Sequence, residues 1–214
     1  MNDINQQDIK QRIFDTAVSL FARKSYGSVG VREIAWAAGV SISMISYHFG
    51  GKVGILKAII NKYFSLFESM FNKVVREEAP FEANIWCFID GCVNLIRQEH
   101  DLSLVWISEL NNEIPEVAEL KALNQKKIAA SANRLLGQVE LDFDRDQELI
   151  SIIGPALIQM IFSHFISGGM LEYNSKVKFD EAYFKRYVDI LSELCLNGIR
   201  GIFPVTGASG KAQD

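Results

Sequence analysis

One short segment carries side chains suited to hydrogen bonding and apolar contact with a large partner. In residues 42–49 (ISMISYHF), Ile45 and Phe49 lie four positions apart, so in a helix both face the same side. If that side is the core, the opposite arc exposes hydroxyls, a thioether and two rings: Ser43, Met44, Ser46, Tyr47 and His48. Such groups are typical of contacts to phosphates and base edges. A helical hairpin inside an all-α enzyme is the alternative for this pattern.

The flanking residues predict the helix–turn–helix that positions this arc. A short helix is predicted over 31–38, with Gly30 as its N-cap and Glu33 placed to reach back to the cap amide. Gly39 can enter the left-handed region and end this helix, and Ser41 can cap the next one. The second helix of such a motif enters the major groove of DNA.

The rest of the sequence argues against an enzyme. None of the three histidines, His48, His100 and His164, belongs to a zinc-protease, nucleophile-elbow or phosphate-loop motif. The three cysteines form no CxxC pair and indicate reduced thiols, and no Cys/His cluster suits a metal. We therefore predict no catalysis, no cofactor and no metal site. With no signal peptide and no apolar run of about 18 residues, we expect a cytoplasmic protein without a membrane partner.

Charge is unevenly distributed along the 214 residues. The whole chain has a net charge of −4, which by itself disfavours a nucleic-acid partner. Residues 1–62, however, contain eight Lys or Arg and four Asp or Glu, a balance of +4 that leaves −8 for residues 63–214. Chance can produce such a split. It also fits a basic part that faces nucleic acid and an acidic part with another task.

The apolar periodicity predicts an all-α fold of nine helices without a sheet. Three helices form an N-terminal helix–turn–helix domain, 1–52, six form a C-terminal domain, 53–203, and residues 204–214 form a disordered tail. Asp8 is expected to cap the first helix. The predicted helices span about 8–23, 31–38, 42–49, 53–78, 81–99, 102–111, 115–136, 147–167 and 179–200.

Residues from about 9 to 56 resemble the DNA-binding domain of the tetracycline-repressor (TetR/AcrR) family of bacterial regulators. The matching text is IFDTAVSLFARKSYGSV, then VREIAWAAGVS, then YHFGGKVGIL. The IA-x-x-AGVS element and the YHF-x-x-K-x-x-L-like element match the family in order and spacing. The resemblance covers about a quarter of the chain, because the body of this family is divergent. It implies a transcriptional regulator with a ligand-sensing and dimerising C-terminal domain.

The resemblance also implies roles for single residues. In the family, the position of Lys52 contacts a phosphate at the start of helix four, and that of Arg32 often meets a phosphate or a guanine. Ile42 can pack on a thymine methyl group or, alternatively, inward. The implied DNA-contact set is Arg32, Ser41, Ile42, Ser43, Met44, Ser46, Tyr47, His48 and Lys52.

Three positions depart from the family pattern. Ser25 stands where a glycine is common, and Gly30 stands where a threonine commonly caps the helix. Ser46 stands where a tyrosine often contacts phosphate, and its hydroxyl has a shorter reach. These departures bear on individual contacts and not on the family resemblance.

The last two long helices carry more apolar side chains than one core contact requires. In the family, these helices pair into a four-helix bundle, giving a homodimer whose recognition helices meet the two half-sites of a palindrome. The alternative is that the surplus belongs to the core of the single chain. The predicted interface residues are Ile153, Leu157, Ile161, Tyr187, Leu191, Leu194 and Ile199.

The resemblance implies an effector cavity among the fourth to eighth helices. Such pockets are mostly apolar with few polar anchors. The candidate lining is Phe67, Phe71, Trp86, Trp106, Phe162 and Phe165, with Asp90, Glu109 and His164 as anchors. The alternative is that the aromatic residues are plain core and that His164 is a buried histidine with its hydrogen bonds satisfied.

The sequence therefore predicts a ligand-responsive DNA-binding regulator. Its simplest form is a homodimeric repressor that binds a palindromic operator and is released by a small, largely apolar effector. Two alternatives stay open: a dimeric binding module with the same fold, and an activator or corepressor-type regulator without ligand-induced release.

Overall fold

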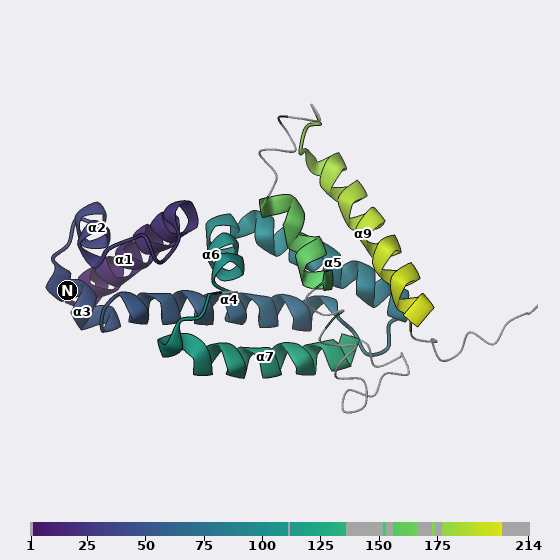
Figure 1. The fold of residues 1–214 in the computed structure, drawn as a ribbon, viewed down its shortest axis with the longest axis horizontal. Helices are drawn as coiled ribbons and strands as arrows, with labels where there is room; N and C mark the ends of the chain where they lie inside the picture. Colours follow the sequence, from purple (N-terminus) through teal and green to yellow (C-terminus); the bar gives the residue numbers. More distant parts are fainter. Residues whose placement is uncertain are drawn as a thin grey trace, which may run out of the picture. The chain divides into compact units, whose positions relative to one another are not determined.

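The computed structural model describes residues 2–110, 112–135, 152, 156–166, 173 and 177–202. Within these ranges all regular secondary structure is helical, which confirms the all-α prediction (Figure 1). The chain divides into an N-terminal unit, Met1–Glu68 with Arg97–Gln125, and a C-terminal unit, Ser69–Ile96 with Lys126–Asp214. The predicted domain boundary after residue 52 stays a prediction, and the predicted tail lies outside the described residues.

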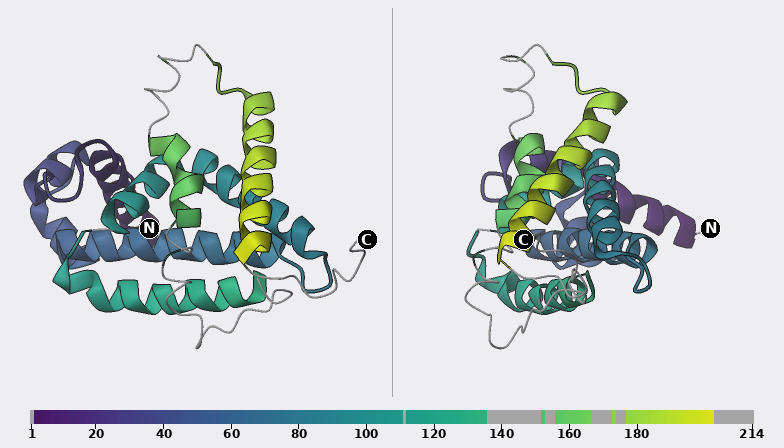
Figure 2. Two further views of the ribbon diagram at one scale, coloured as in Figure 1. Left: turned by 45° about the vertical axis from the view of Figure 1, so that its right-hand side comes forward. Right: turned by 90° about the vertical axis from the view of Figure 1, so that its right-hand side faces the viewer.

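The first three helices form the head of the N-terminal unit: α1 (Asn2–Lys24), α2 (Val31–Ala37) and α3 (Ile42–Phe49) (Figures 1 and 2). Ile13 of α1, Ile34 of α2 and Ile45 of α3 are fully buried, at 0% exposure each. Full burial of such a side chain contributes roughly 1.5–3 kcal/mol. A helix as short as α3 is unstable alone, so this packing holds it in place. The predicted bounds of α2 and α3 are confirmed to within one residue.

The turn between α2 and α3 forms as the sequence predicts. Gly39 has a φ of +64°, the left-handed conformation that ends α2 without a steric penalty. Val40 then donates its N–H to the Ala35 carbonyl oxygen at 2.9 Å, which satisfies one of the last carbonyls of α2. The crossing of the two helices is therefore fixed by backbone geometry.

Three capping details differ from the prediction. α1 begins at Asn2, so Asp8 lies inside the helix, because the polar residues before it continue the helix without an apolar period. Glu33 does not cap α2, since its Oε1 lies 2.6 Å from Lys24 Nζ in an exposed ion pair. Ser41 precedes α3 but makes no side-chain cap bond, and its Oγ lies 2.7 Å from Ser43 Oγ.

Helix α4 (Lys52–Val74) follows α3 through a tight turn. Gly50 and Gly51 have φ values of +70° and +108°, which glycine adopts readily. Gly54, in the first turn of α4, meets the main chain of Phe49, whose carbonyl group occupies the place where a Gly54 Cβ would lie. A glycine at position 54 is therefore a steric requirement of the path from α3 to α4.

The remaining helices are α5 (Phe81–Gln98), α6 (His100–Leu110), α7 (Pro115–Leu135) and α9 (Glu181–Ile202). The predicted helix 147–167 is described over 156–166, where it is helical, and with it the described helices fit the nine-helix plan. Within the N-terminal unit, α6 packs against α1. Over the ranges that the structure describes, no helix is long and apolar enough to cross a membrane.

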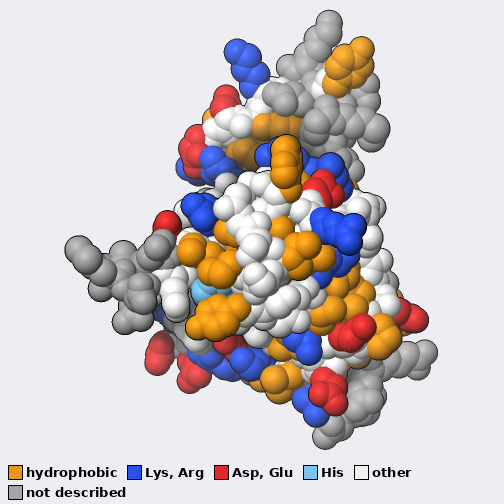
Figure 3. All heavy atoms as spheres, turned by 90° about the vertical axis from the view of Figure 1, so that its left-hand side faces the viewer, with side chains coloured by type: hydrophobic (Ala, Val, Ile, Leu, Met, Phe, Trp, Pro, Cys, Tyr) orange, Lys and Arg blue, Asp and Glu red, His pale blue; other side chains and the backbone are white. Residues whose placement is uncertain are grey.

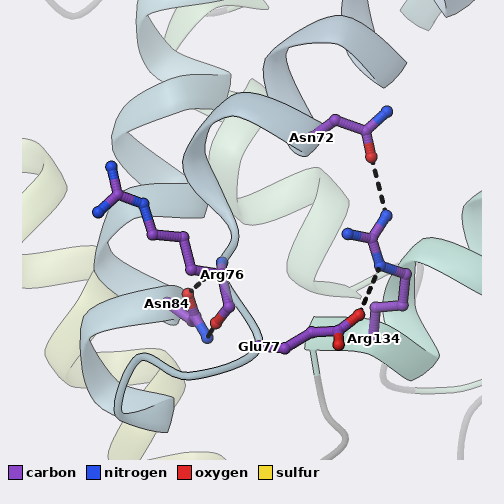
Figure 4. Close-up of polar contacts among 5 residues, drawn as sticks. All are labelled: Asn72, Arg76, Glu77, Asn84 and Arg134. Carbon is purple, nitrogen blue, oxygen red and sulfur yellow. Dashed lines mark hydrogen bonds and ion pairs between the residues drawn. The ribbon is translucent and has the colours of Figure 1, made fainter.

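In the C-terminal unit, hydrogen bonds and an ion pair join the end of α4 and the residues after it to α5 and α7 (Figure 4). Asn84 of α5 accepts from the Arg76 N–H at 3.0 Å and donates to the Arg76 carbonyl at 2.7 Å. Arg134 of α7 donates to Asn72 Oδ1 at 2.8 Å and lies 3.9 Å from Glu77 Oε1. Because Asn84 is 5% exposed, its bonds matter more for stability than the exposed Arg134 pair.

We expect Gly54→Ala to destabilise the head, because the new methyl group would collide with the Phe49 backbone, which cannot yield as a side chain can. Overpacking of this kind costs about 1–3 kcal/mol or more. Chemical denaturation measures the loss of unfolding free energy. Gly27→Ala is the matched control, because no atom lies within 4 Å of its Cβ position. Equal losses in the two variants would contradict the steric explanation.

Candidate nucleic-acid interface

The exposed side chains of α2 and α3 form the candidate interface. Tyr47 is 70% exposed and Ile42 is 42% exposed, although both are large and apolar in part. Tyr47 lies opposite the buried Ile45 on α3 and therefore points outward. Ile42, the first residue of α3, is on the same side as Ile45 but is exposed, so it does not pack fully into the core. Figure 3 shows the molecule from the side of the head, where hydrophobic side chains and Lys or Arg side chains lie next to each other. Also exposed are Arg32, Ser41, Ser43 and Ser46.

The polar groups of α3 have few competing partners inside the head. Ser46 Oγ donates only a long bond, 3.4 Å, to the Ile42 carbonyl, and it can exchange this bond for an outside acceptor. The His48 ring is half-buried and lies edge-on to Tyr47, with ring centroids 4.9 Å apart. Among the described residues, His48 Nε2 has no hydrogen-bond partner. Met44 is half-buried beside these residues.

Lys52 differs from the other predicted contacts because its ammonium already has protein partners. Its Nζ donates to the carbonyl oxygens of Tyr26 and Val29, at 2.8 Å each. It also lies 4.0 Å from the centroid of the Tyr26 ring, in a cation–π contact. The phosphate contact that the family resemblance implies for Lys52 stays a prediction, and the structure gives this residue a second, internal task.

Two features near the interface were missed in the sequence. Trp36 of α2 is 85% exposed, and it lies one helical turn after Arg32, on the side that Ile34 and Ala35 leave open. The apolar spacing of α2, which places Ile34 and Ala35 on the buried side, already indicated that Trp36 is exposed. A hollow of about 600 Å³ beside His48 is lined in part by Gln6, Lys10 and Gln11 of α1. Nothing in the sequence pattern indicates it, because it depends on how α1 packs.

The head defines the chain as a helix–turn–helix protein of the all-α class. Residues 13–59 match the family model described as bacterial regulatory proteins, tetR family. The probable HTH-type transcriptional regulator YttP of Bacillus subtilis (strain 168) is 38% identical over 55 residues, 26% of this chain and 27% of that protein. The HTH-type transcriptional regulatory protein RaaS of Mycobacterium tuberculosis is 49% identical over 47 residues, 22% of each chain. The chain thus matches about a quarter of the length of these curated relatives.

A likeness in fold extends over more of the chain. A TetR-family transcriptional regulator from Bordetella parapertussis 12822 superposes with a TM-score of 0.68 at 16% identity, covering 86% of this chain and 93% of that chain. The match over residues 13–59 supports a regulator of the TetR family, and the superposition, at 16% identity, shows that the fold is shared over more of the chain. The relatives are named as regulators and not as enzymes, in agreement with the prediction that this chain is not an enzyme.

The predicted effector residues are divided between the two units. Phe67, Trp106 and Glu109 belong to the N-terminal unit. Trp106 stacks on the Tyr63 ring at 5.4 Å, so it is a packed core residue of this unit. Glu109 is 1% exposed, and its Oε1 has no hydrogen-bond partner among the described residues, while Oε2 accepts from Asn112 at 3.0 Å. The predicted role of Glu109 as a polar anchor for an effector stays a prediction.

The other six effector candidates belong to the C-terminal unit: Phe71, Trp86, Asp90, Phe162, His164 and Phe165. Trp86 donates its indole N–H to Asp189 Oδ1 at 2.8 Å, and Asp90 Oδ2 accepts from Asn94 at 3.0 Å. His164 is 5% exposed, and its Nδ1 lies 3.2 Å from Tyr183 Oη. These groups have partners within the chain, as the plain-core alternative expects, and their role toward an effector stays a prediction.

The predicted dimer residues differ in exposure. Ile161 and Leu191 are 4% and 6% exposed and pack inside the C-terminal unit, so they are not free to meet a second subunit. The Tyr187 hydroxyl donates to the Met160 and Ile161 carbonyls, at 2.9 and 3.1 Å, and joins α9 to the helix over 156–166. Leu194 is 55% exposed and Leu157 is half-buried. Ile153 and the Ile199 side chain lie outside the described residues.

We expect His164 to make the protein less stable in acid. Burial lowers the pKa of His164 below its ordinary value of 6.5. The unfolded chain therefore takes up this proton before the folded chain does, so stability is full above pH 6.5 and falls as the pH drops toward the lowered pKa. His164→Phe should reduce the loss of unfolding free energy between neutral and mildly acidic pH, measured by urea denaturation.

His100→Gln replaces an exposed histidine of the N-terminal unit and is the control for this experiment, so the change in His164→Phe is compared with the change in this variant. An unchanged pH dependence in His164→Phe would show that the buried imidazole does not control acid stability.

Proposed function

We propose that this chain is a DNA-binding transcriptional regulator, acting in the cytoplasm, whose α2 and α3 contact duplex DNA. The observation that supports this proposal best is the exposure of Tyr47, Ile42 and Arg32, while the other side of the head is closely packed. An exposed aromatic ring with a hydroxyl tip suits a phosphate or a base edge, and an exposed arginine suits a phosphate or a guanine. The match of residues 13–59 to the family model covers this same segment.

The test of the proposed interface is sequence-selective DNA binding by the full chain. A duplex is first selected from a randomised library, and binding is then followed by fluorescence anisotropy at several salt concentrations. Tyr47→Ala should weaken binding roughly tenfold or more, because a hydrogen bond to a charged group is worth about 1.5–3 kcal/mol. Enrichment of an inverted repeat would support a palindromic operator.

Tyr173→Ala is the matched control for this test, since Tyr173 is 86% exposed and lies in the C-terminal unit. Its binding should equal that of the unchanged protein. If no sequence is enriched, or if Tyr47→Ala binds as tightly as Tyr173→Ala, the proposed interface is wrong.

We further propose a homodimer, and the supporting observation is an exposed apolar pair on α9. Ile190 and Leu194 are 60% and 55% exposed and lie one helical turn apart. Ile166, on the helix over 156–166, is 55% exposed as well. Exposed apolar groups in such a row are typical of a contact with another chain, and a second copy gives the two-fold symmetry that a palindrome requires.

Light scattering after gel filtration tests the dimer. The double substitution Ile190→Asp with Leu194→Asp should halve the molar mass at micromolar concentration, because two carboxylates would be buried without partners in the interface. Lys185→Asp, exposed on the same helix, is the control and should leave the mass unchanged. A chain that is monomeric before mutation, or a double variant that stays dimeric, would contradict the proposed interface.

We also propose that a small, largely apolar molecule weakens operator binding, so that the protein acts as a repressor until the molecule binds. The support is the set of aromatic side chains near buried polar groups, which is typical of ligand pockets. Linkage requires that the ligand weaken DNA affinity by the same factor as DNA weakens ligand affinity. A thermal-shift screen provides candidate ligands, and their effect on operator affinity is the test. A ligand that tightens operator binding would instead favour a corepressor-type regulator.

A further inference from the structure

The first turns of α1 present polar side chains that the core of the head does not use. Gln6 and Gln7 lie four and three positions before Lys10, so all three share one face of the helix, and all three are exposed. We infer that this face extends the DNA interface beyond α3, and that the hollow between α1 and His48 receives a phosphate group of the DNA backbone, bound by the Lys10 ammonium. The inference rests on the proposed DNA-binding function.

The hollow, of about 600 Å³, is formed by helices of the N-terminal unit. α1 contributes Gln6, Gln7 and Lys10 to its lining, and α3 contributes His48 and Phe49. None of the described residues that line it is Asp or Glu. The lining therefore offers N–H donors and a positive charge without a carboxylate, which suits a phosphate group.

The Lys10 ammonium lies near the hollow, and its charge is not neutralised there. Its Nζ is 5.8 Å from the centroid of the Phe49 ring, a cation–π contact that is weak at an exposed site. Among the side chains that the structure describes, no carboxylate pairs with Lys10. Its N–H donors are therefore available to an anion from outside the chain.

The other wall of the hollow belongs to the proposed interface itself. His48 lines the hollow, and its ring lies edge-on to the exposed Tyr47 ring. His48 Nε2 has no hydrogen-bond partner within the described part of the chain, and a phosphate oxygen is an acceptor for the tautomer that is protonated there. Because phosphate backbones border the major groove, a site next to Tyr47 lies where a backbone phosphate is expected when α3 enters the groove.

The charge of the surrounding sequence also favours an anionic partner. Residues 34–67 contain three lysines and no Asp or Glu. Of the α1 carboxylates, Asp8 and Asp15 are outside the lining, and Asp15 accepts a hydrogen bond from Gln11 at 2.8 Å. The polar start of α1 has no apolar period, so the core does not require it to be helical. A contact with the DNA backbone gives this extension a function.

The first test is the salt dependence of binding to the selected duplex by the full chain. Each phosphate contact contributes about 0.9 to the slope of log K against log salt concentration. Lys10→Gln should therefore reduce the slope by about 0.9 for each bound subunit. Lys62→Gln is the matched control, because Lys62 is an exposed lysine of α4 outside this hollow, and it should keep the slope. The melting temperatures of the two free variants should be equal, since both side chains are exposed.

Two results of the salt experiment would overturn the inference. One is an equal slope in Lys10→Gln and Lys62→Gln. The other is an unchanged slope with a lower melting temperature in Lys10→Gln, which would make Lys10 a packing residue of the head. Tyr47→Ala, measured in the same series, separates the inference from the proposed function. If Tyr47→Ala weakens binding while Lys10→Gln behaves as its control, only the inference fails, and if neither changes binding, the interface on α3 fails as well.

The second test uses the unchanged protein. The full chain is treated with an acylating reagent, with and without the selected duplex, and the modification rate of each lysine is followed by mass spectrometry. The duplex should slow the reaction of Lys10 several-fold and leave that of Lys62 unchanged. Inorganic phosphate, at the same concentration of phosphate groups, should protect neither lysine. An equal rate for Lys10 in the free and bound protein, or equal protection by inorganic phosphate, would contradict a site for the DNA backbone.

A third test adds a negative charge to the hollow. Gln7→Glu should weaken binding at low salt, because its carboxylate would repel the phosphate, and the difference should shrink as salt screens the charges. Gln125→Glu adds the same charge at an exposed position of α7 in the same unit, so it is the matched control and should bind more tightly than Gln7→Glu. Equal affinities of these two variants would show that no phosphate lies at the hollow.

Discussion

The contact between the Phe49 carbonyl and Gly54 determines how α3 leaves the core and how α4 begins. No side chain larger than hydrogen fits at position 54, and the two glycines before α4 hold left-handed backbone angles that other residues avoid. α3 packs against α1 and α2, Ile45 is fully buried, and the opposite arc of α3 is exposed. The direction in which Tyr47 points follows from this backbone constraint and not from any contact that Tyr47 makes.

The positive charge of residues 1–62 is the second feature that bears on contact with DNA. Residues 1–62 hold eight cations and four anions, a balance of +4, yet these cations have different partners. Lys24 pairs with Glu33 at the surface, and Lys52 is bound by two carbonyl oxygens inside the head. The positive balance therefore describes a part of the chain that attracts an anionic partner in general, while the contacts that select a sequence must come from the exposed residues of α2 and α3.

The parts of the structure that depend on local sequence could be predicted. The bounds of α2 and α3 follow from apolar spacing and from Gly39, and the exposed arc of α3 follows from the burial of Ile45. The start of α1 could not be predicted, because residues 2–7 carry no apolar period. The partners of Lys52 could not be predicted either, since they are main-chain carbonyls 23 and 26 residues away along the chain. The hydrogen bond from the Trp86 indole to Asp189 could not be predicted for the same reason, since the two residues are 103 positions apart.

The central claim is that the exposed residues of α2 and α3 meet duplex DNA. Hydroxyl-radical labelling of the full chain, with and without its selected duplex, tests this claim directly, because Trp36, Tyr47 and Tyr173 are 85%, 70% and 86% exposed in the free protein. Binding should strongly reduce the oxidation of Tyr47 and leave Tyr173 unchanged. Equal oxidation of Tyr47 in the free and bound protein, under conditions where the duplex is bound, would show that the DNA lies elsewhere on the molecule.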